Sequence, residues 1–368
     1  MTKYTTENYI EHLGEREYDF FVLGGDIGGT NTKFGLSGVK SHNIDLISSC
    51  HFKTSDFTNV SEPLTLAINY FKKKYNINDI KNIAVAGAGP IINHECKLTN
   101  ANFIIKKDEV EKIARCKGFV INDFEAMGFG INILQNEDLI QISNLQNNEI
   151  KNIDAKGILG IIGAGTGLGE SILVFDYEFR FYRPLPSEGG HINFPAENEF
   201  ESEMANFINI KEKSEVSGDL PYEDFLSSRG IENIYSFIRY KNFYPSTSNK
   251  YTKKIDLSNQ KTPLIATEYS EIDKTCKKTM EIFIKFYARF AINFALTILP
   301  KKLYITGGIA QKNIKWFRKN LFISEFEKHR KYDEFLKEIP VYIITNPNIG
   351  LYGACFAAAN IDKLSERR

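Results

Sequence analysis

Short apolar runs separated by polar positions dominate the first half of the chain. Three of them lie close together and predict strands at 20–26, 31–38 and 44–52, and their short links are typical of an antiparallel meander. A dinucleotide-binding unit is parallel from its first strand, so this start indicates a different α/β fold. The elements predicted next alternate between helix and strand, at 61–75, 80–86, 108–115, 118–122 and from 124 onward.

The second half repeats the theme. A strand at 157–162 leads into a glycine-rich turn at 163–169, which echoes residues 20–38 and indicates an internal duplication. Helices dominate afterwards. The other elements predicted here are strands at 170–175, 178–183, 303–306 and 341–344, and helices at about 271–298 and at 350–359.

Two segments fall outside this alternation. Residues 1–18 are polar and predict an extension or a short helix on the surface, and residues 241–262 are polar and aromatic without a period, as expected of a surface insertion. We expect an N-terminal extension over 1–18, a small α/β lobe over 19–134 and a large α/β lobe over 135–368. The last helix could return to the small lobe.

Composition supports this picture. The 368 residues exceed one ordinary core, and a hydrophobic content of 42% with 25% charged residues is that of a soluble globular protein. Lys+Arg and Asp+Glu both total 46, which disfavours nucleic-acid binding. The five cysteines form no C-x-x-C pair, which argues against a zinc site or a disulfide framework. With no apolar leader and no run of membrane-span length, we expect a cytoplasmic protein without a membrane partner.

The most informative segment is 24–31, with the sequence Gly-Gly-Asp-Ile-Gly-Gly-Thr-Asn, directly after the apolar run 20–23. Glycines let a phosphate approach the backbone, turn N–H groups form an anion cradle, and Asp26 offers the hard oxygen that hydrated Mg²⁺ prefers. A tight β-turn that uses Asp and Gly only for geometry is the alternative. We expect a nucleotide-phosphate hairpin.

Two further glycine clusters have weaker signals. The run 163–169 lacks the P-loop pattern and misses the dinucleotide spacing, because Leu168 stands where the third glycine should be. It could be a simple hairpin, but in a second lobe opposite the first hairpin it becomes a second phosphate clamp. The segment 306–309 closes a strand and opens a helix, which suits a nucleoside or phosphate, although a packing pair of glycines is nearly as plausible.

Three side chains are candidates for catalysis or for binding the substrate. Asp123 falls at the C-terminal end of a strand, a usual location for functional groups in α/β sheets, although it could be a helix N-cap worth about 1 kcal/mol. Glu188 and His191 flank two glycines, and no further His or Cys stands at metal-ligand spacing. A pair that hydrogen-bonds a polyol is favoured, with a satisfied histidine in a structural loop as the alternative.

Taken in the order in which they follow one another along the chain, the motifs resemble those of the bacterial-type glucokinase family, in the sugar kinase/actin/Hsp70 fold group. Residues 98–100, Leu-Thr-Asn, resemble its sugar-side loop, and the likeness spans roughly residues 20–360. It implies a two-lobed ribonuclease-H-like (actin-like ATPase) fold with a duplicated β-meander/βαβ core. It also implies ATP-dependent phosphorylation of D-glucose at the 6-hydroxyl, and we expect a homodimer.

The resemblance implies a role for each matching residue. Asp123 is the general base, and Asp26 holds the Mg²⁺ that accompanies ATP, through water. The residues that bind the sugar are Asn100, Asn122, Asp123, Glu188, His191 and, in less distinctive surroundings, Glu223. Those that bind the nucleotide are Asp26, Gly28, Gly29, Thr30, Asn31, Gly163, Gly165, Thr166, Gly167, Gly307 and Gly308.

Several alternatives stay open. The related ROK branch carries a Cys-rich zinc motif after its sugar-binding histidine, and no cysteine lies between 116 and 276, so a ROK-like kinase for another hexose or an N-acetylhexosamine ranks lower. A sugar-sensing regulator should carry a helix-turn-helix, for which residues 1–18 are too short. An actin-like filament former would lack the set formed by Asp123, Glu188 and His191. ADP or polyphosphate could replace ATP as the donor.

Overall fold

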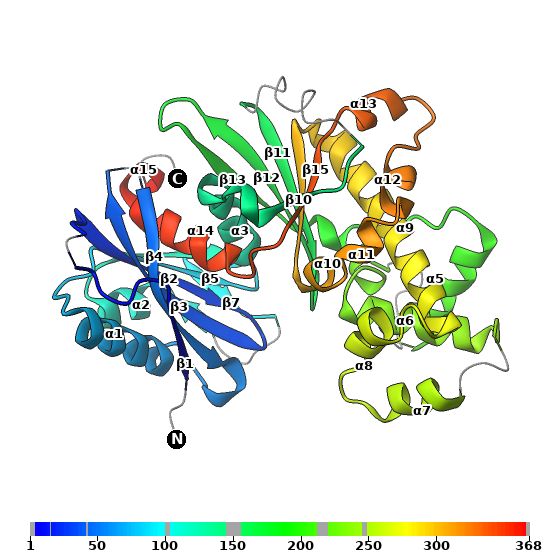
Figure 1. Ribbon diagram of the computed structural model, residues 1–368, viewed down its shortest axis with the longest axis horizontal. Helices are drawn as coiled ribbons and strands as arrows, with labels where there is room; N and C mark the ends of the chain where they lie inside the picture. The colour runs from blue at the N-terminus through cyan, green and yellow to red at the C-terminus, as the bar shows by residue number, and fades with distance from the viewer. Residues whose placement is uncertain are drawn as a thin grey trace. The chain divides into compact units, whose positions relative to one another are not determined.

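The computed structural model describes residues 4–14, 16–41, 43–99, 104–144, 156–211, 220–244 and 249–365. The chain divides into two compact units (Figure 1). Unit 1 comprises Met1–Asn136, Leu173–Pro186 and Asn348–Arg368, and unit 2 comprises Glu137–Ile172 and Ser187–Pro347. No helix in the described part of the chain is long and apolar enough to span a bilayer.

Unit 1 is built on a six-stranded sheet of order β1-β4-β3-β2-β5-β9. The first three predicted strands form an antiparallel meander, and two further strands extend it in parallel with β2, so the predicted change from meander to alternation is confirmed. The strands are β1 (Thr5–Asn8), β2 (Phe20–Ile27), β3 (Asn31–Lys40), β4 (Asn43–Lys53), β5 (Asn82–Gly87) and β9 (Lys117–Asn122).

Helices cover both faces of this sheet, because alternate strand residues are apolar on each face. On one face, Leu23 and Val85 lie in the same core cluster as Leu64 of α1 (Ser61–Tyr75) and Val110 of α2 (Lys107–Ala114). On the other, Val22 lies in one cluster with apolar residues of α3 (Asp123–Gly130) and α14 (Ile349–Ala359). Helix α15 (Ile361–Ser365) follows, and β6 (Ile91–Ile92), β7 (Glu95–Lys97) and β8 (Ile104–Lys106) form a small separate sheet.

The sequence left two forms open for the N-terminal segment, an extension or a short helix, and its described residues contain no helix. Thr5–Asn8 forms the edge strand β1, which pairs antiparallel with β4. The outer edge of β4 offers unpaired backbone groups that this strand satisfies. Because three of the four β1 residues are exposed, no apolar alternation marked the strand in the sequence.

Unit 2 contains most of a second six-stranded sheet, of order β10-β15-β14-β11-β12-β13. Its central strands β11 (Ile158–Ala164), β14 (Lys302–Thr306) and β15 (Val341–Ile344) are parallel, and β10 (Leu139–Gln141) is antiparallel to β15. The glycine-rich turn joins β11 to β12 (Leu168–Asp176), and β13 (Phe181–Ser187) follows. The predicted strand–glycine turn–strand repeat is therefore present.

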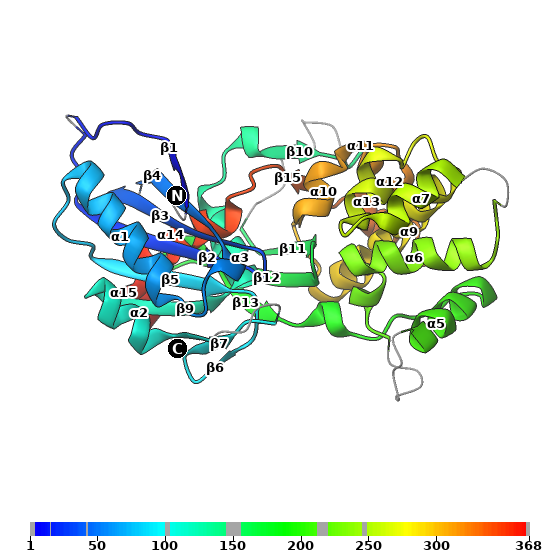
Figure 2. The same ribbon diagram turned by 90° about the horizontal axis from the view of Figure 1, so that it is seen from below.

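The remaining core of unit 2 is helical (Figure 2). Its centre is α9 (Lys274–Ile298), whose Phe294 packs against β11 where Gly160 leaves room. The predicted surface insertion contains α7 (Asn249–Leu257), and Ile255 of this helix is fully buried, so the segment is not merely a surface loop. The other helices are α5 (Glu199–Lys211), α6 (Ser228–Tyr240), α8 (Lys261–Pro263), α10 (Gly308–Lys312), α11 (Ile314–Phe317), α12 (Leu321–Phe326) and α13 (Asp333–Lys337).

Candidate active site

The carboxyl ends of three parallel strands meet at one edge of the unit 1 sheet. Register places Ile27 of β2 opposite Gly87 of β5, and Gly87 opposite Asn122 of β9. Asp26 precedes this row and Asp123 follows it, two strands away, or about 10 Å across the sheet. The first predicted phosphate motif and the predicted base therefore lie at one edge of one sheet, where α/β proteins commonly bind ligands.

The first hairpin does not need its glycine at position 28. Gly28 N–H donates to the Asn31 carbonyl at 2.9 Å, and neither Gly28 nor Gly29 has a positive φ. A Cβ at Gly28 would make only ordinary contact, 3.6 Å from that same oxygen. Thr54 fastens the turn, donating its hydroxyl to the Gly28 carbonyl at 2.8 Å. The exposed Thr30 and Asn31 complete a turn that leaves its backbone accessible, as a phosphate cradle requires.

Asp26 is half-buried beside the start of α14. A Cβ at Gly350 would lie 2.9 Å from its Oδ2. Burial raises the pKa of Asp26, and the positive charge of Lys33 opposes that shift. The described residues contain no cluster of three or more His, Cys, Asp or Glu side chains able to hold a metal. A single carboxylate fits Mg²⁺ that keeps most of its waters and arrives with nucleotide phosphates.

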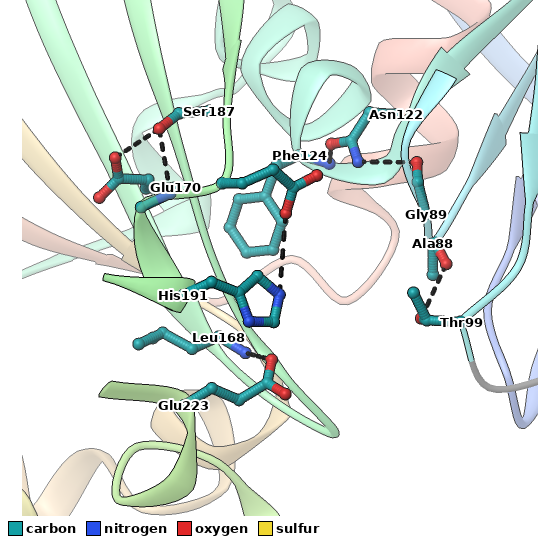
Figure 3. A network of polar contacts seen from close by, with 12 residues as sticks. Ala88, Gly89, Thr99, Asn122, Phe124, Leu168, Glu170, Ser187, His191 and Glu223 are labelled. Carbon is teal, nitrogen blue, oxygen red and sulfur yellow. Dashed lines mark hydrogen bonds and ion pairs between the residues drawn. The ribbon is translucent and has the colours of Figure 1, made fainter. Parts of the chain in front are cut away.

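Asn122 and Asp123 have different local roles. Asn122 is the N-cap of α3: its Oδ1 accepts from the backbone N–H of Phe124 at 2.8 Å and of Glu125 at 3.3 Å (Figure 3). Its Nδ2 donates to the Gly89 carbonyl at 3.1 Å. Asp123, the first residue of the helix, is half-buried, and its Oδ1 lies 3.0 Å from Phe124 N. The cap that the sequence allowed for Asp123 is thus supplied mainly by Asn122.

The predicted sugar-side loop is only partly described. Thr99 donates to the Ala88 carbonyl from both its backbone N–H and its hydroxyl, each at 3.0 Å (Figure 3). This ties it to the loop after β5, which contacts Asn122 through Gly89. Asn100 lies outside the described residues.

The second hairpin is held by Glu223. Leu168 N–H donates to Glu223 Oε2 at 2.9 Å, and a Cβ at Gly167 would lie 2.5 Å from the same oxygen (Figure 3). Gly165, by contrast, has open space where a Cβ would stand, and Thr166 is exposed. A side chain at Gly167 would therefore displace the Glu223 carboxylate, whereas packing does not require Gly165.

The third glycine motif lies beside this hairpin. Gly163 of β11 is registered with Thr306 of β14, so the two motifs follow adjacent parallel strands. Gly307 has φ +90° and sits against the Ala164 carbonyl, where a Cβ would overlap. It is thus a conformational and packing glycine, whereas Gly308 faces open space. The helix that it opens, Gly308–Lys312, has only five residues.

Glu188 and His191 project from a short turn. His191 Nε2 lies 3.9 Å from Glu188 Oε2 (Figure 3). Both side chains are more than half exposed. The intervening glycines are required by packing, because a Cβ at Gly189 would overlap Glu170 and one at Gly190 would overlap the Leu168 carbonyl. The pair therefore faces outward from a tightly supported turn.

Glu170 supports the Glu188–His191 turn, and the sequence did not single it out. It is buried, and its Oε1 accepts from the Ser187 hydroxyl at 2.6 Å; the same hydroxyl accepts from Gly189 N–H at 3.2 Å. Desolvation raises the pKa of Glu170, and the Ser187 hydrogen bond partly offsets this. An acidic residue on a strand directly after a glycine turn was the available signal.

Backbone pairing brings Glu223 close to the Glu188–His191 turn of unit 2. Tyr222 N–H donates to the Ile192 carbonyl at 3.0 Å, and Asn193 and Pro221 form an antiparallel bridge. Glu223 thus follows a segment paired with the residues just after His191. Within unit 2 the fold gathers the Glu188–His191 turn, Glu223 and the second hairpin. Within unit 1 it gathers the first hairpin, Asn122 and Asp123.

Comparison with known proteins agrees with these motifs. A family model described as Glucokinase matches residues 23–361. A glucokinase of Nostoc punctiforme is 31% identical over 358 residues, covering 92% of this chain and 99% of its own.

Solved structures agree on the architecture. A glucokinase from an Antarctic psychrotroph superposes with a TM-score of 0.73 at 21% identity, covering 94% of this chain and 100% of its own. A glucokinase of Balamuthia mandrillaris, solved in complex with glucose, gives 0.71 at 21% identity, covering 92% and 94%. The predicted actin-like ATPase fold is confirmed. Because the family model matches most of this chain, the chain belongs to the glucokinase family.

Proposed function

We propose that this chain transfers the γ-phosphoryl group of ATP to the 6-hydroxyl of D-glucose, with Asp123 as general base. The observation that carries the assignment is the row Ile27–Gly87–Asn122, which sets Asp123 at the same sheet edge as the Asp26 hairpin. Phosphoryl transfer needs positioning and charge neutralisation more than covalent chemistry, and this edge supplies an acceptor for a proton and a cradle for phosphate.

In the proposed reaction the sugar O6 forms a bond to the γ-phosphorus while the bond from that phosphorus to the β–γ bridging oxygen breaks. Asp123 accepts the proton of the 6-hydroxyl, and ADP leaves with its charge neutralised by Mg²⁺. Asp26 would hold this ion through water. The products are glucose 6-phosphate and ADP.

Unit 2 supplies the remaining proposed contacts. The exposed Glu188 and His191 offer an acceptor and a donor to sugar hydroxyls. Glu223 accepts from the second hairpin, so we propose that it couples sugar recognition to the position of Gly165 and Thr166. The nucleotide contacts proposed here are Gly163, Gly165, Thr166, Gly167, Gly307 and Gly308.

A coupled assay of the purified chain tests the activity directly. With Mg²⁺ present, we expect glucose to be phosphorylated with ATP faster than with ADP or polyphosphate. N-acetylglucosamine and mannose serve as competing acceptors. No turnover of glucose with any donor, or faster turnover of an N-acetylhexosamine, would refute the assignment.

Replacing the base tests the mechanism. Asp123→Asn keeps the shape of the side chain, and we expect turnover to fall at least about 10²-fold, the low end of what a general base contributes. Glucose binding, measured by calorimetry, should persist. Asp108→Asn, at an aspartate in the first turn of α2, serves as the matched control and should leave turnover unchanged. Near-normal turnover of the Asp123 variant would remove the assignment.

Two further expectations come from the sequence. We propose a homodimer, which light scattering after gel filtration would test, and a cytoplasmic location, which fractionation of the source cells would test. Neither affects the assignment of the base.

A further inference from the structure

The segment before the family match is firmly attached to unit 1. The match begins at residue 23, whereas β1 already pairs with β4, and the N–H groups of Tyr9 and Ile10 donate to the Ile47 carbonyl at 3.0 and 3.1 Å. Asn8 anchors the segment further. Its Oδ1 lies within 3.2 Å of the hydroxyls of Ser48, Tyr70 and Tyr75.

From this attached segment, Tyr9 reaches the start of α14. Its hydroxyl donates to Glu7 Oε2 at 2.7 Å and accepts from Asn348 Nδ2 at 3.0 Å. Asn348 immediately precedes α14 and is only 8% exposed, so this amide needs partners within the protein.

The other end of the Asn348 amide holds Lys33. Lys33 Nζ donates to Asn348 Oδ1 at 2.7 Å. Because the amide nitrogen is oriented by Tyr9, the oxygen that receives the lysine is oriented as well. A lysine side chain is long and flexible, so a defined hydrogen-bond partner determines where its ammonium group lies.

Lys33 is the ladder partner of Asp26, directly opposite it on β3. Side chains at opposed positions lie on the same face, about 5 Å apart at Cβ. That face is the one covered by α14, since the Asp26 carboxylate contacts Gly350. Hydrogen bonds thus link Tyr9 through Asn348 to Lys33, and backbone register places Lys33 opposite Asp26 at the first phosphate hairpin.

We propose that Tyr9 is a positioning residue for the nucleotide: through Asn348 it fixes the Lys33 ammonium beside Asp26, so that the first hairpin presents a set arrangement of charges to the phosphates and their Mg²⁺. This rests on the proposed nucleotide role of that hairpin. Charges fixed in advance bind phosphate at a smaller entropic cost than mobile ones. The segment that precedes the family match therefore acts on nucleotide affinity.

The experiment measures binding as well as turnover, in the full chain. Tyr9→Phe removes one hydroxyl and keeps the ring. We expect the Kd for Mg²⁺ with a non-hydrolysable ATP analogue, by calorimetry, to rise about two- to tenfold, the range of one hydrogen bond. The KM for ATP should rise in parallel, while the Kd for glucose and kcat at saturating ATP stay within about twofold.

Two controls distinguish this role from simple docking of the segment. Tyr70→Phe removes a hydroxyl from the Asn8 anchor without touching Asn348, and it should leave the Kd for the analogue unchanged. In a Lys33→Met background, Tyr9→Phe should have no further effect on that Kd. An unchanged Kd in Tyr9→Phe, an equal rise in Tyr70→Phe, or a full effect without Lys33 would each overturn the proposal. Failure of the proposed function would show separately, as wild-type protein that binds the analogue but does not phosphorylate glucose.

Discussion

At the scale of single residues, the glycines of the motifs include two kinds. Gly189, Gly190 and Gly307 have structural reasons, because a Cβ at each would overlap a neighbouring oxygen. Gly165 and Gly308 have none, since a Cβ there meets open space. Where packing and backbone conformation do not require glycine, the remaining advantage of glycine is that a ligand can approach its backbone closely. A phosphate cradle needs this property.

Gly165→Ala and Gly189→Ala should therefore separate binding from stability. We expect Gly165→Ala to change the free energy of unfolding by less than about 1 kcal/mol, while the KM for ATP rises about tenfold or more. Gly189→Ala should lower stability by about 1–3 kcal/mol, because the methyl group displaces Glu170. Denaturant unfolding and steady-state kinetics measure both quantities. A larger loss of stability in Gly165→Ala and a larger rise of the KM for ATP in Gly189→Ala would contradict the phosphate cradle.

The buried Glu170 should make stability depend on pH. Its pKa is raised in the folded protein, so the native state holds the proton more tightly than the unfolded chain. Its contribution to stability is therefore greatest below the unfolded pKa of about 4.5 and is lost as the pH rises through the folded pKa. Glu170→Gln cannot ionise, so the unfolding free energy of this variant relative to wild type should increase between pH 4 and pH 8.

Ser187→Ala provides the matched test of that mechanism. It removes the hydrogen bond that lowers the pKa of Glu170, so the loss of stability should move to higher pH. A difference between Glu170→Gln and wild type that stays constant across this pH range would show that Glu170 does not titrate as described.

At the scale of elements, the stability of unit 1 depends on the packing of α14 on α3. Gly353 of α14 lies so close to α3 that a Cβ would overlap the Ala126 carbonyl, and α3 begins at Asp123. The apolar run 350–359 predicted a buried helix, and this is confirmed. The sequence allowed this helix to return to the small lobe, but it did not identify α3 as the neighbour, because a contact such as that between Ala126 and Gly353, more than 220 positions apart, leaves no local period.

Gly353→Ala should therefore be severely destabilising. The obstacle is backbone of another helix, which cannot move aside as a side chain does, and we expect a loss of more than about 3 kcal/mol or no soluble protein. Gly118→Ala is the control, since its Cβ would meet mainly the flexible side chain of Glu111, and it should cost about 1 kcal/mol. Equal unfolding midpoints for the two variants would contradict this packing.

At the scale of the whole molecule, the family and the order of the main elements followed from sequence, because strong periodicity and ordered motifs carry both. The strand β1 and the buried Ile255 did not, since polar neighbours mask them. The motif residues could be proposed from sequence, but their structural roles could not. Only the hydrogen bonds show that Asn122 caps α3 and that Glu223 accepts from the second hairpin.

The thiols give a test of the molecule as a whole. All five cysteines are free, and burial raises the pKa of Cys50 and Cys96 to about 12 and of Cys116 and Cys355 to about 11; that of Cys276 is raised further. Little thiolate therefore forms at pH 8. We expect a chromogenic disulfide reagent to modify native protein slowly, beginning at the half-buried Cys116, and five thiols after denaturation. Rapid reaction of several native thiols would contradict the burial.

The discontinuity of unit 1 has a consequence for synthesis. The unit needs residues 1–136, 173–186 and 348–368, and Asp26 at its N-terminal hairpin rests against Gly350. During translation the strands of the first sheet are made early, but α14 follows only after more than 200 further residues have left the ribosome. Until then, the face of the sheet that α14 covers in the folded protein stays exposed. Unit 2 has most of its residues by then. The first hairpin is thus among the first parts to be made and among the last to be finished, an interval in which chaperones have an exposed apolar surface to bind.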